Sequence, residues 1–234
     1  MQKALKAAAV VICLALFTVT AFASTVLYPI DSTTSITVGD KTFYNFTCTV
    51  TTSTDGAFPG DCSTLSVAAY TNPDGLFGIQ ILGAFSVTTL NEIAKQGEDV
   101  LITYDATATS PNLFHDVTMD FNGSASGIAL ASVTETVNNL ASPFQLLGQI
   151  TVTNGPPTSN LTASADLLAD VPGIAVSKDV LLTATPPPTG FSDATISFIH
   201  QNFSQTPEPA SLLLLGTGLL GLGTIARRKM KRRA

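Results

Sequence analysis

Two cysteines are the first candidates for chemistry in this chain of 234 residues. Cys48 and Cys62 remain once Cys13, inside an apolar N-terminal segment, is set aside. In an oxidising compartment such a lone pair predicts a disulfide, and closing a loop of about 15 residues is worth about 3 kcal/mol in the chain-entropy model. Two free thiols are the alternative. A metal site is disfavoured because His115 and His200, the two histidines, are distant in sequence.

The other candidate catalytic patterns are incomplete. His115 and Asp116 are adjacent, so on a strand their side chains would point to opposite faces and could not converge as a triad does. The stretch from Gly123 to Gly127 has Ala125 where a GxSxG elbow needs serine, and we interpret it as a turn. No loop shows the DxDxDG spacing of a calcium site, and nothing selects two carboxylates for glycoside hydrolysis. We therefore expect no catalytic residue, no cofactor and no metal.

Charge is distributed very unevenly along the chain. Between residues 24 and 205 there are three lysines, no arginine and 16 of the 17 acidic residues, which gives a formal charge of −13. Such a surface repels phosphate backbones, so nucleic acid is an unsuitable partner. The segment is long enough to bury a sizeable core, and it suits a secreted protein kept soluble by charge repulsion.

Apolar and polar residues alternate throughout this segment, as they do in strands with one buried and one solvated face. We expect about nine or ten short strands in an antiparallel β-sandwich of jelly-roll type, giving an all-β fold. Turn signals lie between the strands, including the glycines at 39, 75, 97 and 155. The predicted inward faces include Tyr44, Phe46, Cys48 and Val50; Ile79, Ile81, Phe85 and Val87; Val100, Ile102, Tyr104 and Ala106; Val117, Met119 and Phe121; and Ile196, Phe198 and His200.

The front of the chain has the three parts of a secretory signal peptide, which we place at residues 1–23. Lys3 and Lys6 precede an apolar run, and the small residues Ala21 and Ala23 precede the expected cleavage point before Ser24. A membrane anchor is the alternative, but the apolar run is short for a span. We expect signal peptidase to act here.

The C-terminal segment, residues 206–234, differs in composition from the segment before it. Pro207, Glu208 and Pro209 are stiff and extended, and the uncharged run 210–226 is at the lower limit for a membrane helix. A GxGxxG pattern inside this run lacks the strand and amphipathic helix of a dinucleotide site, so we interpret its glycines as helix-packing residues. Six positive charges follow within 227–234, which keeps this end cytoplasmic and the preceding domain outside. They are Arg227, Arg228, Lys229, Lys231, Arg232 and Arg233.

The proline-flanked glutamate, the apolar run and the terminal basic cluster together resemble the PEP-CTERM sorting domain of Gram-negative bacteria, also called the ice-binding protein C-terminal domain. The resemblance implies recognition by exosortase, a membrane cysteine protease or transpeptidase that cleaves near the motif. It further implies traffic linked to exopolysaccharide and biofilm matrix. An ordinary single-pass anchor is the alternative. The precursor would lie in the inner membrane with a periplasmic ectodomain, and the product at the cell surface or outside.

The ectodomain, residues 24–205, is similar to a group of uncharacterised PEP-CTERM ectodomains through the stretch 36–46 and the closing stretch 199–205. That group has no established activity. We expect a structural or adhesive matrix protein that contacts exopolysaccharide. A carbohydrate-binding module is the alternative, weakened by the absence of tryptophan, and a glycan-acting enzyme is a more distant one.

Overall fold

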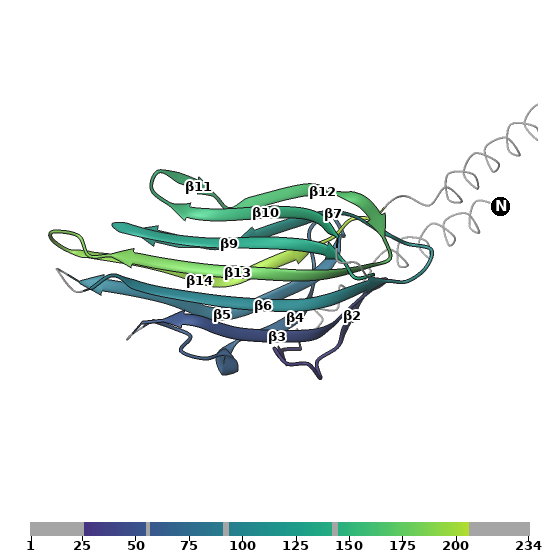
Figure 1. Ribbon diagram of the computed structural model, residues 1–234, viewed down its shortest axis with the longest axis horizontal. Coiled ribbons are helices and arrows are strands. Elements are labelled where there is room, and N and C mark those ends of the chain that lie inside the picture. Colours follow the sequence, from purple (N-terminus) through teal and green to yellow (C-terminus); the bar gives the residue numbers. More distant parts are fainter. Residues whose placement is uncertain (1–25, 55–56, 91–93, 142–144, 206–234) are drawn as a thin grey trace, which may run out of the picture.

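A computed structural model describes residues 26–54, 57–90, 94–141 and 145–205. These residues form two antiparallel sheets packed face to face, with one short 3₁₀ helix, η1 (Cys62–Thr64). Figure 1 shows the long strands running along the longest axis of the molecule. The predicted all-β sandwich is confirmed.

The first sheet has the strand order β1-β4-β5-β14-β7-β12, and β8 also pairs with β14. Its strands are β1 (Tyr28–Pro29), β4 (Ser66–Thr71), β5 (Phe77–Leu90), β14 (Phe191–Asn202), β7 (Phe114–Phe121), β12 (Thr162–Val171) and β8 (Ser124–Ser126). The last long strand, β14, therefore lies in the middle of this sheet, between β5 and β7.

The second sheet has the order β11-β10-β9-β13-β6-β3-β2 (Figure 1). Its strands are β11 (Thr158–Asn160), β10 (Leu146–Gly155), β9 (Ile128–Asn139), β13 (Gly173–Thr185), β6 (Gln96–Ala108), β3 (Lys41–Ser53) and β2 (Ile36–Val38). The loop that contains Pro187 joins β13 to β14 and carries the chain from one sheet to the other.

The core lies between the sheets and is formed by the apolar face of each strand, to which every second residue contributes. The inward faces predicted for β5, β6 and β7 are confirmed, since their apolar side chains are almost completely buried. Several strands are longer than expected, with 13 residues in β3, β6 and β13 and 14 in β5. One reason is that the turn predicted around Gly97 is wrong. Gly97 lies inside β6 and pairs with Thr183 of β13.

Three residues of the predicted inward faces, Tyr44 in β3 and Phe198 and His200 in β14, are placed wrongly because β-bulges shift the phase of the alternation. The other members, Phe46, Cys48, Val50 and Ile196, lie on the core side as predicted. In β3 the register shifts between Tyr44 and Thr47, where Asn45 has a φ of 54°. As a result Phe43 is fully buried while Tyr44 is half-buried. A bulge inserts one residue, and everything beyond it changes side.

The same effect operates in β14. The register shifts between Ile196 and Phe198. Beyond the shift Ile199 and Gln201 are fully buried, whereas Phe198 and His200, predicted to point inward with Ile196, lie on the partly exposed face.

Several turns form as predicted. Gly39 and Gly75 have positive φ values of 59° and 82° between paired strands, and Gly155 leads into the β10–β11 connection. The stretch around Ser124–Ser126 differs from the expected turn, because it pairs with β14 as the short strand β8.

The signal peptide at 1–23 and the sorting tail at 206–234, with its expected helix 210–226, lie outside the described residues, and the boundary at residue 24 remains a prediction. Within the ranges that the structure does describe, no helix is long and apolar enough to cross a membrane.

Candidate functional site

The residues considered for catalysis do not converge. His115 Nδ1 lies 2.8 Å from Asp170 Oδ1, and this hydrogen bond raises the pKa of His115. The neighbouring Asp116 instead accepts a hydrogen bond from the backbone N–H of Ser204, at 2.9 Å. Ser126 donates to Asp193 in the β8–β14 pair, and neither residue is hydrogen-bonded to a histidine. Across the described ranges, no group of three His, Cys, Asp or Glu side chains could hold a metal ion.

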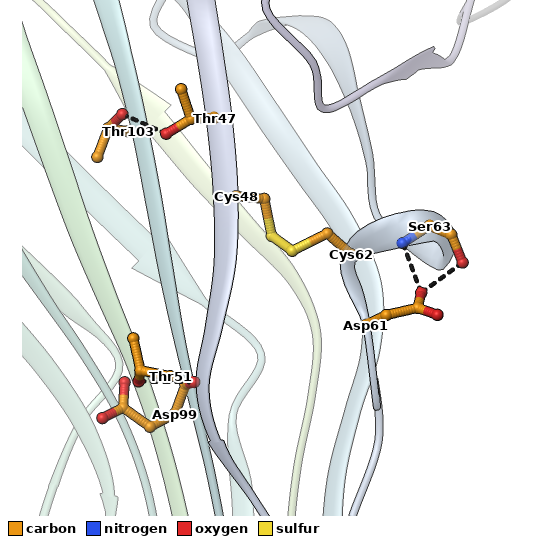
Figure 2. Close-up of a disulfide and its surroundings, with 8 residues drawn as sticks. All are labelled: Thr47, Cys48, Thr51, Asp61, Cys62, Ser63, Asp99 and Thr103. Carbon is orange, nitrogen blue, oxygen red and sulfur yellow. Dashed lines mark hydrogen bonds between the residues drawn. A yellow bond between two sulfur atoms is a disulfide. The ribbon is translucent and has the colours of Figure 1, made fainter.

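Cys48 and Cys62 form the predicted disulfide, with Cα atoms 6.0 Å apart. Figure 2 shows that the bridge ties β3 to η1. Asp61 caps η1 by accepting hydrogen bonds from the N–H and hydroxyl of Ser63, and the N–H bond is 2.8 Å long. The disulfide therefore holds the connection between β3 and β4 to the second sheet, and the cap stabilises the turn that carries Cys62.

A polar site lies at the end of the sandwich where the chain passes to the expected sorting motif. Its centre is the carboxylate of Asp40, in the turn between β2 and β3. Asp40 accepts hydrogen bonds from Lys41 Nζ at 3.1 Å, from Asn112 Nδ2 at 2.9 Å and from Gln205 Nε2. Three segments distant in sequence thus meet on one carboxylate.

Lys41 is the cation of this site, and its side chain is 2% exposed. Burial lowers the pKa of Lys41, and the hydrogen bond to Asp40 opposes that shift. Its Nζ lies 5.7 Å from the centre of the Phe77 ring. A buried lysine is costly without a counter-charge, so Asp40 and the aromatic ring compensate its lost hydration.

The last described residues remain in the fold up to Gln205. Phe203 is fully buried and packs edge-on against Phe114, with ring centroids 5.2 Å apart. The backbone of Ser204 bonds to His115 and Asp116, and Gln205 forms an isolated bridge with Phe114. The sandwich is therefore anchored two residues before Pro207.

A second feature is an aromatic stack on the outer face of the first sheet. The His200 ring lies between Tyr70 and Phe198, at centroid distances of 3.9 and 4.4 Å and interplanar angles of 11° and 21°. His200 Nδ1 is 2.9 Å from Asp120 Oδ2. The stack covers both faces of the histidine and one face of each outer ring.

Sequence reasoning missed both features. The Asp40 site joins residues up to 165 positions apart, and no local pattern indicates that contact. The aromatic stack depends on the bulge in β14, which turns Phe198 and His200 away from the core. The sequence places Phe198 and His200 two residues apart, on one face of a strand, but that face was predicted to point into the core.

The predicted processing residues fall outside the described ranges: Ala21, Ala23 and Ser24 at the front, and Pro207, Glu208, Pro209 and the basic cluster from Arg227 to Arg233 at the back.

Residues 205–233 match the family model of the PEP-CTERM protein-sorting motif. The match begins at the anchored Gln205 and includes the proline-flanked glutamate, the apolar run and the basic cluster. The chain therefore carries a signal for exosortase-processed export, as its sequence resemblance implied. No curated protein matches the chain.

Solved structures resemble the chain only distantly. TmCBM61, solved in complex with beta-1,4-galactotriose, is 7% identical, with 68% of this chain and 88% of that chain covered and a TM-score of 0.33. The enzymatically active domain of bacteriophage CBA120 tailspike protein 4 is 14% identical, covering 68% and 19%, with a TM-score of 0.29. A family 12 xyloglucanase from Bacillus licheniformis is 10% identical, covering 78% and 99%, with a TM-score of 0.27. Similarity at this level carries no argument about function.

Proposed function

We propose that this protein is a cell-surface or extracellular-matrix component, exported and then processed by exosortase, with a structural or adhesive role in an exopolysaccharide or biofilm setting. The match of residues 205–233 to the PEP-CTERM sorting motif is the observation that carries the proposal. The disulfide between Cys48 and Cys62 supports an oxidising compartment.

The proposed maturation has two cuts. Signal peptidase removes residues 1–23, and the apolar run 210–226 then holds the precursor in the inner membrane with the sandwich in the periplasm. Exosortase cleaves near Pro207, Glu208 and Pro209 and releases the sandwich or transfers it to an acceptor. The basic cluster 227–234 stays on the cytoplasmic side.

The anchored end of the sandwich limits where exosortase can act. Only four residues separate Gln205 from Ala210, and the five Cα-to-Cα steps between them span at most about 18 Å at full extension. The folded body of the precursor would therefore sit close to the bilayer surface. Because the hydrogen bonds of Asp40 keep Gln205 on the sandwich, the scissile segment would start from a fixed point.

The strongly acidic surface of the sandwich also limits which exopolysaccharide it could contact. Between residues 24 and 205 the formal charge is −13, so the surface would repel a polyanionic glycan. Neutral exopolysaccharide, or acidic exopolysaccharide bridged by divalent cations, fits this surface better.

Fractionation of a Gram-negative host with and without its exosortase tests the proposal. With exosortase, the mature protein should appear outside the cell, lighter than the precursor by both ends. The variant Glu208→Ala should accumulate in the inner membrane, and Asp74→Ala, an exposed turn residue of the sandwich, should behave as the parent. Unchanged release of Glu208→Ala would show that the motif is not read.

A carbohydrate-binding role is the second candidate, and the aromatic stack of Tyr70, His200 and Phe198 is the observation that favours it. The outer ring faces of Tyr70 and Phe198 are not covered by the stack, and Asp120 and Gln80 supply polar groups beside it. Sugars bind to aromatic faces flanked by such hydrogen-bonding groups.

Retention of the exported protein on immobilised neutral polysaccharides tests this candidate. Replacement of Tyr70 or Phe198 by alanine should reduce retention at least tenfold, whereas Phe191→Ala, which removes an aromatic side chain that is 55% exposed elsewhere, should not. Equal retention of all three variants would exclude the stack as the binding face.

A further inference from the structure

The centre of the core contains a polar cluster that the sorting function does not use. Lys178 of β13 and Glu135 of β9 are cross-strand partners in the second sheet, and both are completely buried. Gln201 of β14 reaches them from the first sheet and is also completely buried. A lysine, a carboxylic acid and a carboxamide thus meet between the two sheets.

The contacts place the lysine amine against both of the other groups. Lys178 Nζ is in hydrogen-bonding contact with Glu135 Oε2 and with Gln201 Oε1, and it lies 3.4 Å from Met119 Sδ. The amide carbon Cδ of Gln201 is one bond beyond Oε1. The amide nitrogen Nε2 points the other way and donates to the backbone carbonyl of Thr118 at 3.2 Å.

The charge state of the cluster follows from its burial. Desolvation lowers the pKa of Lys178 and raises that of Glu135, against the attraction between their charges. Both shifts favour a neutral amine beside a protonated carboxylic acid. A neutral amine has a free electron pair, which makes it a nucleophile.

Two further oxygen atoms at the cluster lack hydrogen-bond partners. They are Glu135 Oε1 and Tyr104 OH, both buried, and among the residues that the structure describes neither has a partner. Burial raises the pKa of Tyr104 well above its usual value, and an ionised Glu135 would raise it further, so the two groups share one electrostatic environment. A buried ion pair kept only for stability would be expected to satisfy these atoms.

We propose that Lys178 and Gln201 form an intramolecular isopeptide bond, with Glu135 as the proton relay. Nζ of neutral Lys178 attacks Cδ of Gln201, and the Nζ–Cδ bond forms as the Cδ–Nε2 bond breaks. As Cδ becomes tetrahedral and Nε2 leaves the carbonyl of Thr118, Glu135 gives its proton to Nε2 and takes one from Nζ, so it ends protonated as it began. The leaving group is ammonia, and the step needs no oxidant, metal or cofactor.

The bond would join the two sheets directly. Lys178 and Gln201 are 23 residues apart, on β13 in the second sheet and on β14 in the first. The disulfide, by contrast, ties β3 to η1 at the edge of the molecule. A cross-link in the core resists reducing agents, which a disulfide does not, and this would suit a protein that functions outside the cell.

Peptide mapping of the exported protein, produced from the full chain, tests the proposal without any variant. After denaturation, reduction and trypsin digestion, cleavage after Lys178 should be absent, because trypsin does not cut after an acylated lysine. The peptide that starts at Gln96 should continue past Gln201 and be lighter by one ammonia. A protease that cuts before aspartate should give a branched pair in which 170–178 is joined to the peptide starting at Asp193.

Ordinary cleavage after Lys178, with unmodified peptides on both sides, would overturn the proposal. Loss of water, with 170–178 joined to the peptide that contains Glu135, would also overturn it, because Glu135 would then be the acceptor. In the variant Glu135→Gln, Lys178 should become sensitive to trypsin. The control Lys41→Met removes another buried lysine, one paired with Asp40, and should keep the cross-link.

Discussion

Asp40 and Gln205 are 165 residues apart in the sequence, and the side-chain amide of Gln205 donates a hydrogen bond to the carboxylate of Asp40. The same carboxylate holds Lys41 and Asn112. The first hairpin of the second sheet therefore fixes the point at which the chain leaves the sandwich toward the sorting motif.

Replacing Asp40 by alanine should loosen this end of the molecule. The change removes three hydrogen bonds, one of them from the buried ammonium of Lys41 to its paired carboxylate, so we expect a loss of about 2–3 kcal/mol in the free energy of unfolding. Chemical denaturation measures the loss. Hydrogen exchange should rise most at 203–205, and an unchanged exchange rate there would contradict the anchoring role. Asp74→Ala, on an exposed turn, is the matched control.

The disulfide should contribute measurably to stability. Cys48 and Cys62 close a loop with a sequence separation of 14, for which the chain-entropy model gives about 3 kcal/mol. The double variant Cys48→Ser and Cys62→Ser should lose about that amount in urea denaturation. Reductant should lower the midpoint of the parent protein toward that of the variant and leave the variant unchanged. A parent protein insensitive to reductant would show that the bridge adds nothing.

His115 should report its contact with Asp170 through its titration. The hydrogen bond from His115 to the carboxylate of Asp170 raises the pKa of His115 above its usual value of about 6.5. A raised pKa in the folded state means that protonation favours folding, so the contribution is full below about pH 6.5 and is lost as pH rises through the folded value. In an NMR titration, Asp170→Asn should lower the pKa, and Asp166→Asn, a weaker influence, should lower it less. Identical titrations in the parent and Asp170→Asn would contradict the contact.

The fold could be predicted from sequence because it depends on local signals. Period-two alternation identified the inward faces of β5, β6 and β7, and the glycines at 39, 75 and 155 identified turns. The disulfide followed from the number of cysteines and the export signal. The arguments for faces and turns use only neighbours in the sequence, and alternation directly indicates which face is buried.

The features that could not be predicted from the sequence depend on contacts between distant strands. The bulges near Asn45 and Ser197 have no strong local signature, yet each reverses the faces of the residues that follow. The sequence does carry a signal for the buried cluster, because Glu135 lies in phase with Val133 and Val137, and Lys178 with Val176 and Val180. Charged residues on an apolar face predict a buried pair, although only the structure adds Gln201.

The last prediction concerns Gly78 of β5, which packs against the backbone of β14. A Cβ atom added at Gly78 would lie 1.7 Å from the carbonyl oxygen of Gln201 and 2.9 Å from the Cα of Asn202. Backbone atoms cannot rotate away as a side chain can, so Gly78→Ala should push the two strands apart. We expect a loss of about 3 kcal/mol, because overpacking a well-packed core costs about 1–3 kcal/mol and this contact is with backbone.

Gly60→Ala is the matched control, because a Cβ there would have no heavy atom within 4 Å. Its unfolding free energy should stay within about 0.5 kcal/mol of the parent value. Denaturation of the two variants under the same conditions makes the comparison. The shift at Gly78 should also move Gln201 relative to Lys178, so the variant should lose part of the proposed cross-link. Equal stability of the two variants would mean that β5 and β14 are not as close as the structure places them.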